Sequence, residues 1–144
     1  MYKRQSDHAA KAVEVASDLA SRYDATLTII HAMARAGAWR VPEELRDFAR
    51  MEHVDITENE ILSGVAEEIL NTAAVKAADH GAPSAKTVKE IGDPVRAVVD
   101  YAEGNGVDLI VLGRRGLGAL QELLLGSVST KITHLAKCTC ITVC

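Results

Sequence analysis

Apolar residues along this chain recur either at helical spacing or in short continuous runs, and the two patterns alternate. Helical spacing predicts a first helix that begins after Ser6, with an apolar face made of Ala9, Val13, Ala16, Ala20 and Tyr23. The short runs predict strands at residues 26–32, 85–91, 107–112 and 138–143. This alternation is typical of βαβ units, so we expect parallel strands with helices on both faces.

Three more helices are indicated by their faces or their ends. One has an apolar face made of Leu62, Val65, Ile69, Ala73 and Ala77 and ends before Gly81. The next begins at Asp93 and Pro94, because Asp is favoured at the N-cap and Pro at the first helical position. The last helix covers residues 127–136.

Length and composition limit the class of protein. The 144 residues suit a single domain, 1–144, and with 48% apolar but only 3% aromatic residues the core must consist of small aliphatic side chains. The net charge of −4 provides no basic footprint for nucleic acid. No apolar run reaches the roughly 18 residues of a membrane span, and no signal peptide opens the chain. We therefore expect a cytoplasmic protein that binds neither nucleic acid nor membrane.

The segment 113–129, GRRGLGALQELLLGSVS, carries the clearest chemical signal. Gly113, Gly116 and Gly126 lie between a predicted strand and a predicted helix, and Ser127 and Ser129 follow. Glycines let a backbone approach a ligand closely, and a helix N-terminus attracts anions, so the arrangement favours a phosphate cradle. The alternative is a plain turn followed by a helix cap. The spacing matches neither a Walker A loop nor the dinucleotide fingerprint.

The pattern G-x2-G-x9-G-S resembles the nucleotide signature of the universal stress protein family, in its ATP-binding branch. Gly92-Asp93-Pro94, residues 101–111 and residues 124–128 also resemble that family, in the same order, and the resemblance extends from Ser6 to the C-terminus. It implies a three-layer α/β/α open parallel sheet of the adenine nucleotide alpha hydrolase type, with strand order 3-2-1-4-5. It also implies a homodimer formed through the last strand, residues 139–143.

The resemblance further implies a set of binding residues for ATP. Leu112, Gly113 and Gly116 are expected to line the ribose and phosphates, and the backbone of Ala32 to meet the adenine edge. The phosphates are expected to lie against Gly126, Ser127, Val128 and Ser129. Mg²⁺ is expected to bind through the phosphates, and no direct contact is assigned to Arg114 or Arg115.

The start of the chain departs from the family pattern. Ser6 matches the serine of the family's Asp-Gly-Ser turn, so Arg4 stands where the Asp is expected and Gln5 where the Gly is expected. Residues 1–3 are too short and polar for a central strand. We expect residues 1–5 to be foreign to the family, as in a truncated reading frame. The first strand and its carboxylate would then be missing or degraded.

The function expected from these features is binding of an adenine nucleotide in regulation of the stress response, without catalysis. One alternative is a nucleotide-independent dimeric interaction module, which the missing first strand favours. Another is a weak ATPase, but the glycine segment offers no general base to position a water. His31 is interpreted as a packed or rim residue rather than a catalyst.

The cysteines Cys138, Cys140 and Cys144 cluster at the end of the chain. Neighbours two apart on one strand face are poorly oriented for a disulfide, so reduced thiols are expected. With His134 the spacing also leaves open a metal or redox role, although it fits no standard zinc pattern.

Overall fold

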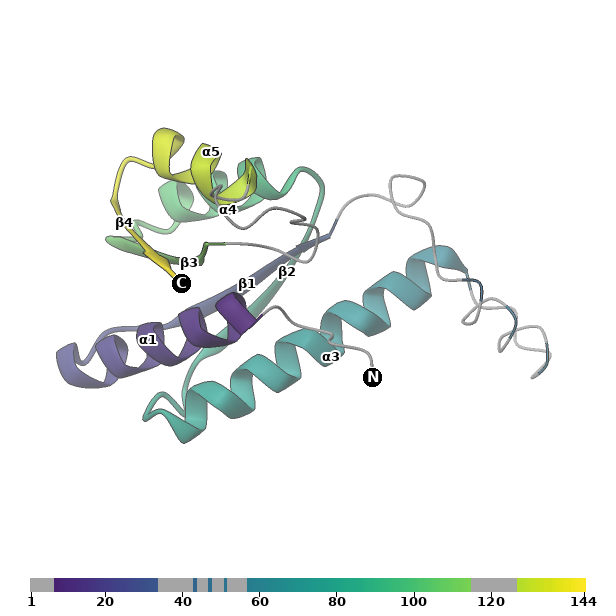
Figure 1. Cartoon of the computed structure of the whole chain (residues 1–144), viewed down its shortest axis with the longest axis horizontal. Helices are drawn as coiled ribbons and strands as arrows, with labels where there is room; N and C mark the ends of the chain where they lie inside the picture. Colours follow the sequence, from purple (N-terminus) through teal and green to yellow (C-terminus); the bar gives the residue numbers. More distant parts are fainter. Residues whose placement is uncertain (1–6, 34–42, 44–46, 48–50, 52–56, 115–126) are drawn as a thin grey trace.

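The computed structural model describes residues 7–33, 43, 47, 51, 57–114 and 127–144 (Figure 1). Its helices are α1 (Asp7–Tyr23), α3 (Glu58–Asp79), α4 (Pro94–Gly104) and α5 (Ser127–Leu135). Its strands are β1 (Thr28–Met33), β2 (Lys86–Ile91), β3 (Leu109–Gly113) and β4 (Thr139–Val143). These helices and strands alternate along the chain, as the sequence pattern predicts.

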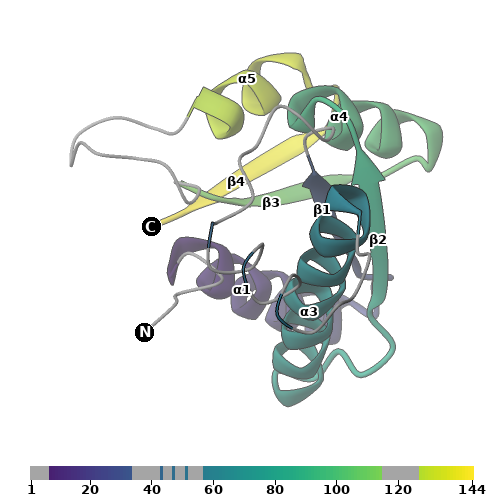
Figure 2. The same ribbon diagram turned by 90° about the vertical axis from the view of Figure 1, so that its right-hand side faces the viewer.

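The strands form two parallel pairs, β1 with β2 and β3 with β4. The pairs lie beside each other with β1 and β3 as the inner strands (Figures 1 and 2). Among the described residues no strand joins the two pairs, and residues 1–6, where the sequence predicts a degraded first strand, are outside them. The parallel α/β class is confirmed, but the sheet is divided at the position where a central strand is expected.

The backbone of β1 has one paired edge and one open edge. The N–H of Lys86 donates to Leu27 at 2.9 Å, and the N–H of Gly92 donates to Met33 at 2.7 Å. Because alternate residues of a parallel strand point to opposite edges, the backbone groups of Thr28, Ile30 and Ala32 face away from β2. Every residue of β1 is only half-buried, unlike the fully covered strands of most parallel sheets.

The helices cover the strands on two sides. Helix α1 packs on β3 and β4, and α3 packs on β1 and β2, whereas α4 contacts β1, β2 and α5. Val95, Ala102, Ile110 and Ile132 form a buried cluster shared by α4, β3 and α5. These contacts give the expected three layers. None of the described helices combines the length and apolar character needed to cross a bilayer.

Most of the local helix signals are confirmed. Asp93 accepts a hydrogen bond from the N–H of Arg96 at 2.9 Å and caps α4, whose first residue is Pro94. Tyr23, in contrast, was expected on the buried face of α1 but is 77% exposed. The buried residues of α1 are Ala12, Ser17 and Ala20, because the face that packs is rotated from the purely apolar one. The Ser17 hydroxyl is satisfied by donating to the carbonyl of Val13 at 2.7 Å.

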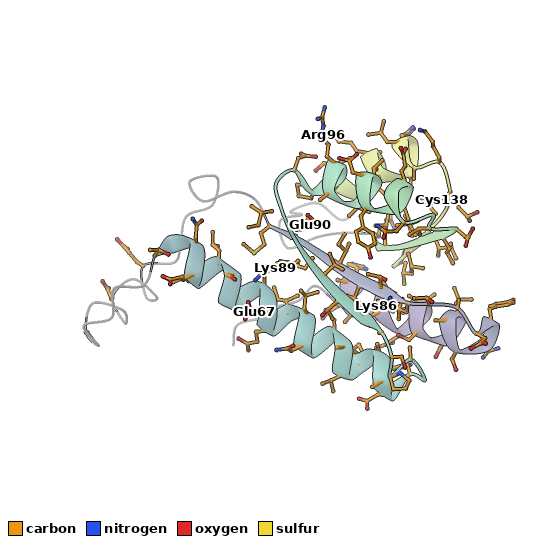
Figure 3. The ribbon with its side chains drawn as sticks, turned by 180° about the vertical axis from the view of Figure 1, so that it is seen from behind. Glu67, Lys86, Lys89, Glu90, Arg96 and Cys138 are labelled. Carbon is orange, nitrogen blue, oxygen red and sulfur yellow. The ribbon has the colours of Figure 1, made fainter. Side chains whose placement is uncertain are left out.

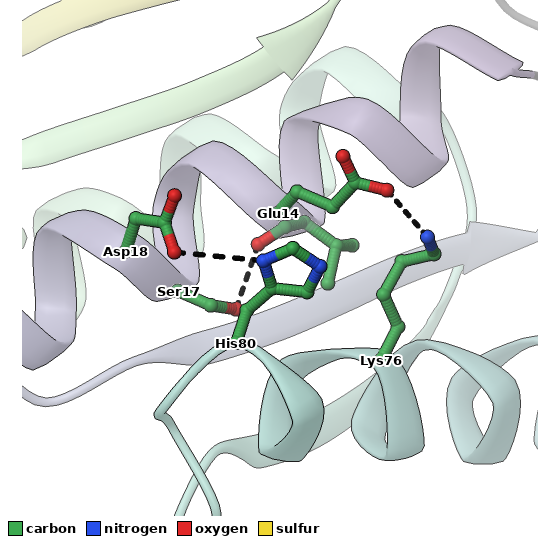
Figure 4. Close-up of polar contacts among 6 residues, drawn as sticks. Glu14, Ser17, Asp18, Lys76 and His80 are labelled. Atoms are coloured by element: carbon green, nitrogen blue, oxygen red, sulfur yellow. Dashed lines mark hydrogen bonds and ion pairs between the residues drawn. The ribbon is translucent and has the colours of Figure 1, made fainter.

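Ion pairs link α1, α3 and β2. Lys76 of α3 pairs with Glu14 of α1 and holds the pKa of that carboxyl below its usual value, chiefly through their hydrogen bond (Figure 4). His80, which follows α3, lies 3.5 Å from Asp18 of α1. On β2, Lys89 donates to Glu67 of α3 at 2.8 Å (Figure 3). The first two pairs join α1 to the end of α3, and the third joins α3 to β2.

The open inner edges of β1 and β3 lead to a stability prediction. Replacing residues 1–5 by an apolar strand of about six to eight residues that ends in Asp-Gly should fill the division between the pairs. Each newly buried aliphatic side chain contributes roughly 1.5–3 kcal/mol before the chain entropy is subtracted. We expect the free energy of unfolding in urea to rise by several kcal/mol.

A Gly/Ser segment of equal length in the same place is the matched control, since it adds backbone without apolar side chains. If the apolar and the Gly/Ser versions unfold at the same urea concentration, the division is not a site for a strand.

Candidate functional site

The candidate site lies where β3 ends and α5 begins. We define the β3–α5 junction as Leu112, Gly113 and Arg114 together with the first turn of α5, residues 127–129. Each pair is parallel, and in Figure 1 all four strands run in the same general direction, so their carboxyl ends face the same side of the fold. In open α/β folds the carboxyl ends of the strands form the ligand-binding edge.

Gly113 is the point at which α1 crosses β3. A Cβ atom added to Gly113 would lie 2.8 Å from the carbonyl carbon of His8 and 2.9 Å from the nitrogen of Ala9. Both are backbone atoms of the first turn of α1, and neither can move aside as a side-chain tip could. Glycine is therefore required here by the close approach of α1, a packing role that is distinct from the approach to a ligand that the sequence predicts.

Arg114 connects β3 to both neighbouring elements through its backbone. Its N–H donates to the carbonyl of Val143 at 2.7 Å and extends the ladder between β3 and β4 by one bond. Its carbonyl accepts a hydrogen bond from the Ser129 hydroxyl at 3.1 Å, which attaches the strand exit to the first turn of α5. The junction is thus held by β4 on one side and by α5 on the other.

The first turn of α5 combines a buried anchor with an accessible surface. Ser129 is 6% exposed, whereas Val128 is 40% exposed and Ser127 is also exposed. The first N–H groups of an α-helix have no partner within the helix, and the helix dipole places a partial positive charge there. An anion can approach this turn from solvent, and the hydrogen bond of Ser129 fixes the position of the turn relative to β3.

The structure brings together only part of the predicted binding set. Leu112, Gly113, Ser127, Val128 and Ser129 all belong to the junction. Gly116 and Gly126 lie outside the described residues.

Ala32 lies near the end of β1 rather than in the junction itself. Its backbone groups face the open edge of that strand, which is the inner edge. This orientation is the one that a backbone contact with a ligand between β1 and β3 requires.

The titratable side chains near this edge have different surroundings. Burial lowers the pKa of His31 and so favours the neutral form of its imidazole. Its half-buried place in β1 agrees with a packing role.

The thiols of Cys138, Cys140 and Cys144 are free. Burial, with a smaller effect of Cys138, raises the pKa of Cys140. In the part of the chain that the structure describes, no three His, Cys, Asp or Glu side chains gather in a way that could hold a metal ion.

Two participants in this geometry have no clear signal in the sequence. One is the backbone of His8 and Ala9, which lies beside Gly113 because of how α1 packs, and no residue pattern predicts this contact. The other is the backbone of Arg114, whose bonds to Val143 and Ser129 follow from its position directly after an apolar strand.

Comparisons with known proteins agree on one family. The model of the universal stress protein family matches residues 4–143. A universal stress protein of Bacillus subtilis (strain 168) is 36% identical over 141 residues, which cover 92% of this chain and 88% of that protein.

Solved structures extend the similarity to the fold. A universal stress protein of Lactobacillus plantarum has a TM-score of 0.75 at 24% identity and covers 96% of this chain and 91% of its own. A universal stress protein solved in complex with cAMP has a TM-score of 0.69 at 28% identity, with coverage of 99% and 92%.

The contact between Gly113 and α1 predicts a destabilising substitution. In Gly113→Ala the new methyl group must displace the backbone of α1, and such overpacking costs about 1–3 kcal/mol. We expect the free energy of unfolding to fall by that amount in urea titrations followed by circular dichroism.

The control is Gly64→Ala in α3, where a Cβ meets nothing within 4 Å. An alanine in an exposed helix should stabilise the protein by about 0.5–1 kcal/mol. Equal effects of the two substitutions would contradict the close approach at Gly113.

Proposed function

The chain belongs to the universal stress protein family, and we propose that it binds an adenine nucleotide, ATP in particular, as a regulatory protein of the stress response. The observation that carries this proposal is the β3–α5 junction. There a strand exit that tolerates only glycine meets a helix N-terminus that is open to solvent. The exposed helix N-terminus suits a phosphate group, because its first N–H groups have no partner within the helix and carry a partial positive charge.

The proposed arrangement assigns each predicted residue a part. The phosphates lie against the first turn of α5, with Ser127 and Val128 offering backbone N–H groups and the buried Ser129 fixing the turn. Leu112 and Gly113 line the ribose side, and the sequence motif adds Gly116 and Gly126. The backbone of Ala32 meets the adenine edge from the open side of β1.

The similarity to a cAMP-bound universal stress protein supports an adenine nucleotide as the ligand class. The proposal is for binding rather than turnover, because the residues that define the junction include no carboxylate or imidazole that could act as a general base. We propose that Mg²⁺ binds only through the phosphates of the nucleotide. Arg4 stands where the resemblance places a carboxylate.

We also propose a homodimer formed through β4. The N–H of Thr139 donates to Asp108 at 3.3 Å, and the carbonyl of Val143 accepts from Arg114, so odd-numbered residues of β4 face β3. The backbone groups of Cys140 and Thr142 therefore face outward along the other edge, which pairs with no described strand. An open edge of this kind is a template for a second copy of the same strand.

Nucleotide binding is tested by titrating the protein with ATP in a calorimeter and by identifying any co-purified nucleotide by mass spectrometry. In Gly126→Val a branched side chain occupies space that the phosphates need. A micromolar site is worth about 8 kcal/mol. A loss of about 2 kcal/mol would weaken binding roughly thirtyfold.

Gly64→Val adds the same side chain to α3, away from the junction, and should bind ATP as the unmodified protein does. Equal affinities in the unmodified protein and in folded Gly126→Val would contradict the phosphate cradle. A purely interaction-based function would show no ATP binding in any of the three proteins.

Dimerisation through β4 is tested by Thr142→Pro, which removes an outward N–H donor without touching the β3–β4 ladder. Sedimentation velocity should show a shift from dimer to monomer. Thr142→Val keeps the N–H and should remain dimeric. A monomer at high concentration of the unmodified protein would rule out the proposed assembly.

A further inference from the structure

Arg114 is the one residue of the junction whose side chain carries a positive charge. It is half-buried, and its Nε atom is buried without a hydrogen-bond partner among the described residues. A guanidinium group has several N–H donors and no acceptor, and leaving a buried donor without an acceptor costs free energy. The side chain therefore has at least one N–H donor without an acceptor in the described part of the protein.

The other hydrogen bond of this side chain is weak. Nη1 of Arg114 donates to Sγ of Cys144 at 3.7 Å, and a thiol is a poor acceptor. No carboxylate in the described ranges forms an ion pair with Arg114. The strongest natural partners of a guanidinium are carboxylates and phosphates, which accept two parallel N–H bonds. A ligand phosphate could replace the thiol contact at little cost.

The position of Arg114 is fixed independently of its side chain. Its N–H is bonded to Val143 and its carbonyl to Ser129, so its Cα atom stands between the end of β4 and the first turn of α5. The guanidinium thus extends from a fixed point that is bonded to the first turn of α5, and its Nη1 atom reaches Cys144 just beyond β4. The planar fork of a guanidinium group also loses less entropy for each hydrogen bond that it forms with a ligand.

The geometry points to Arg114 as a direct phosphate ligand of the bound nucleotide, through a charge-assisted hydrogen bond from its guanidinium group. This inference rests on the proposed function and adds a selective element to it. Arg114 distinguishes phosphorylated adenine nucleotides from adenosine, whereas Ala32 and Leu112 contact parts that both share.

The experiment measures dissociation constants for adenosine, AMP and ATP by calorimetry. Arg114→Gln removes the charge and should weaken the binding of AMP and ATP at least about tenfold, since a hydrogen bond to a charged group is worth that much. The affinity for adenosine should change less than twofold. Arg114→Lys keeps the charge without the planar fork, so its affinities for AMP and ATP should lie between those of the unmodified protein and of Arg114→Gln.

The matched control is Arg22→Gln, which removes the same charge from the last turn of α1. That position is roughly 20 Å along the helix axis from the turn that contacts Gly113. Its affinities for all three ligands should equal those of the unmodified protein. Circular dichroism establishes whether each variant is folded. If Arg114→Gln does not fold, the affinities of Arg114→Lys test the inference instead.

The outcomes separate this inference from the function on which it rests. An unmodified protein that binds none of the three ligands overturns both. Unchanged ATP affinity in Arg114→Gln, in a protein that binds ATP, overturns only the role of Arg114. An equal loss for adenosine and ATP also overturns it, because it reveals a structural effect rather than a phosphate contact.

Discussion

The fold depends on one close contact, in which the backbone of α1 lies against the backbone of β3 at Gly113. The first turn of α1 rests on the end of β3, with His8 and Ala9 at distances that no Cβ atom would permit. This contact places α1 across β3 and β4. The backbone bonds of Arg114 then fix β4 and α5 around the same point. Packing of the helices and the geometry of the candidate site thus have a common origin.

The divided sheet is the second constraint. Both inner strands have an open edge, and β1 is half-buried along its whole length, so the sheet contributes less apolar burial than a continuous one. Ion pairs between α1 and α3, such as Glu14 with Lys76, lie on the side of the sheet where these helices pack (Figure 4). Exposed or half-exposed pairs are worth little individually, so they orient the helices more than they stabilise them.

Much of this could be predicted from the sequence. Asp93 and Pro94 predict the start of α4 because capping is a local effect. The alternation of helical and strand patterns predicts the parallel α/β class. The burial of α1 was predicted less well, with Tyr23 exposed and Ser17 buried, because the packed face depends on where α3 lies. The sequence alone assigns no contact to Arg114, because the meaning of its charge depends on which groups surround it in three dimensions.

The central claim is that the β3–α5 junction binds the phosphates of an adenine nucleotide. Its most direct test is an amide NMR titration with ATP, because each backbone N–H reports on its own surroundings. The account predicts chemical-shift changes concentrated at Gly113, Arg114, Ser127 and Val128, with Lys76 on the far side unchanged. Saturating ATP that leaves these amides unshifted, or shifts only amides elsewhere, would contradict it.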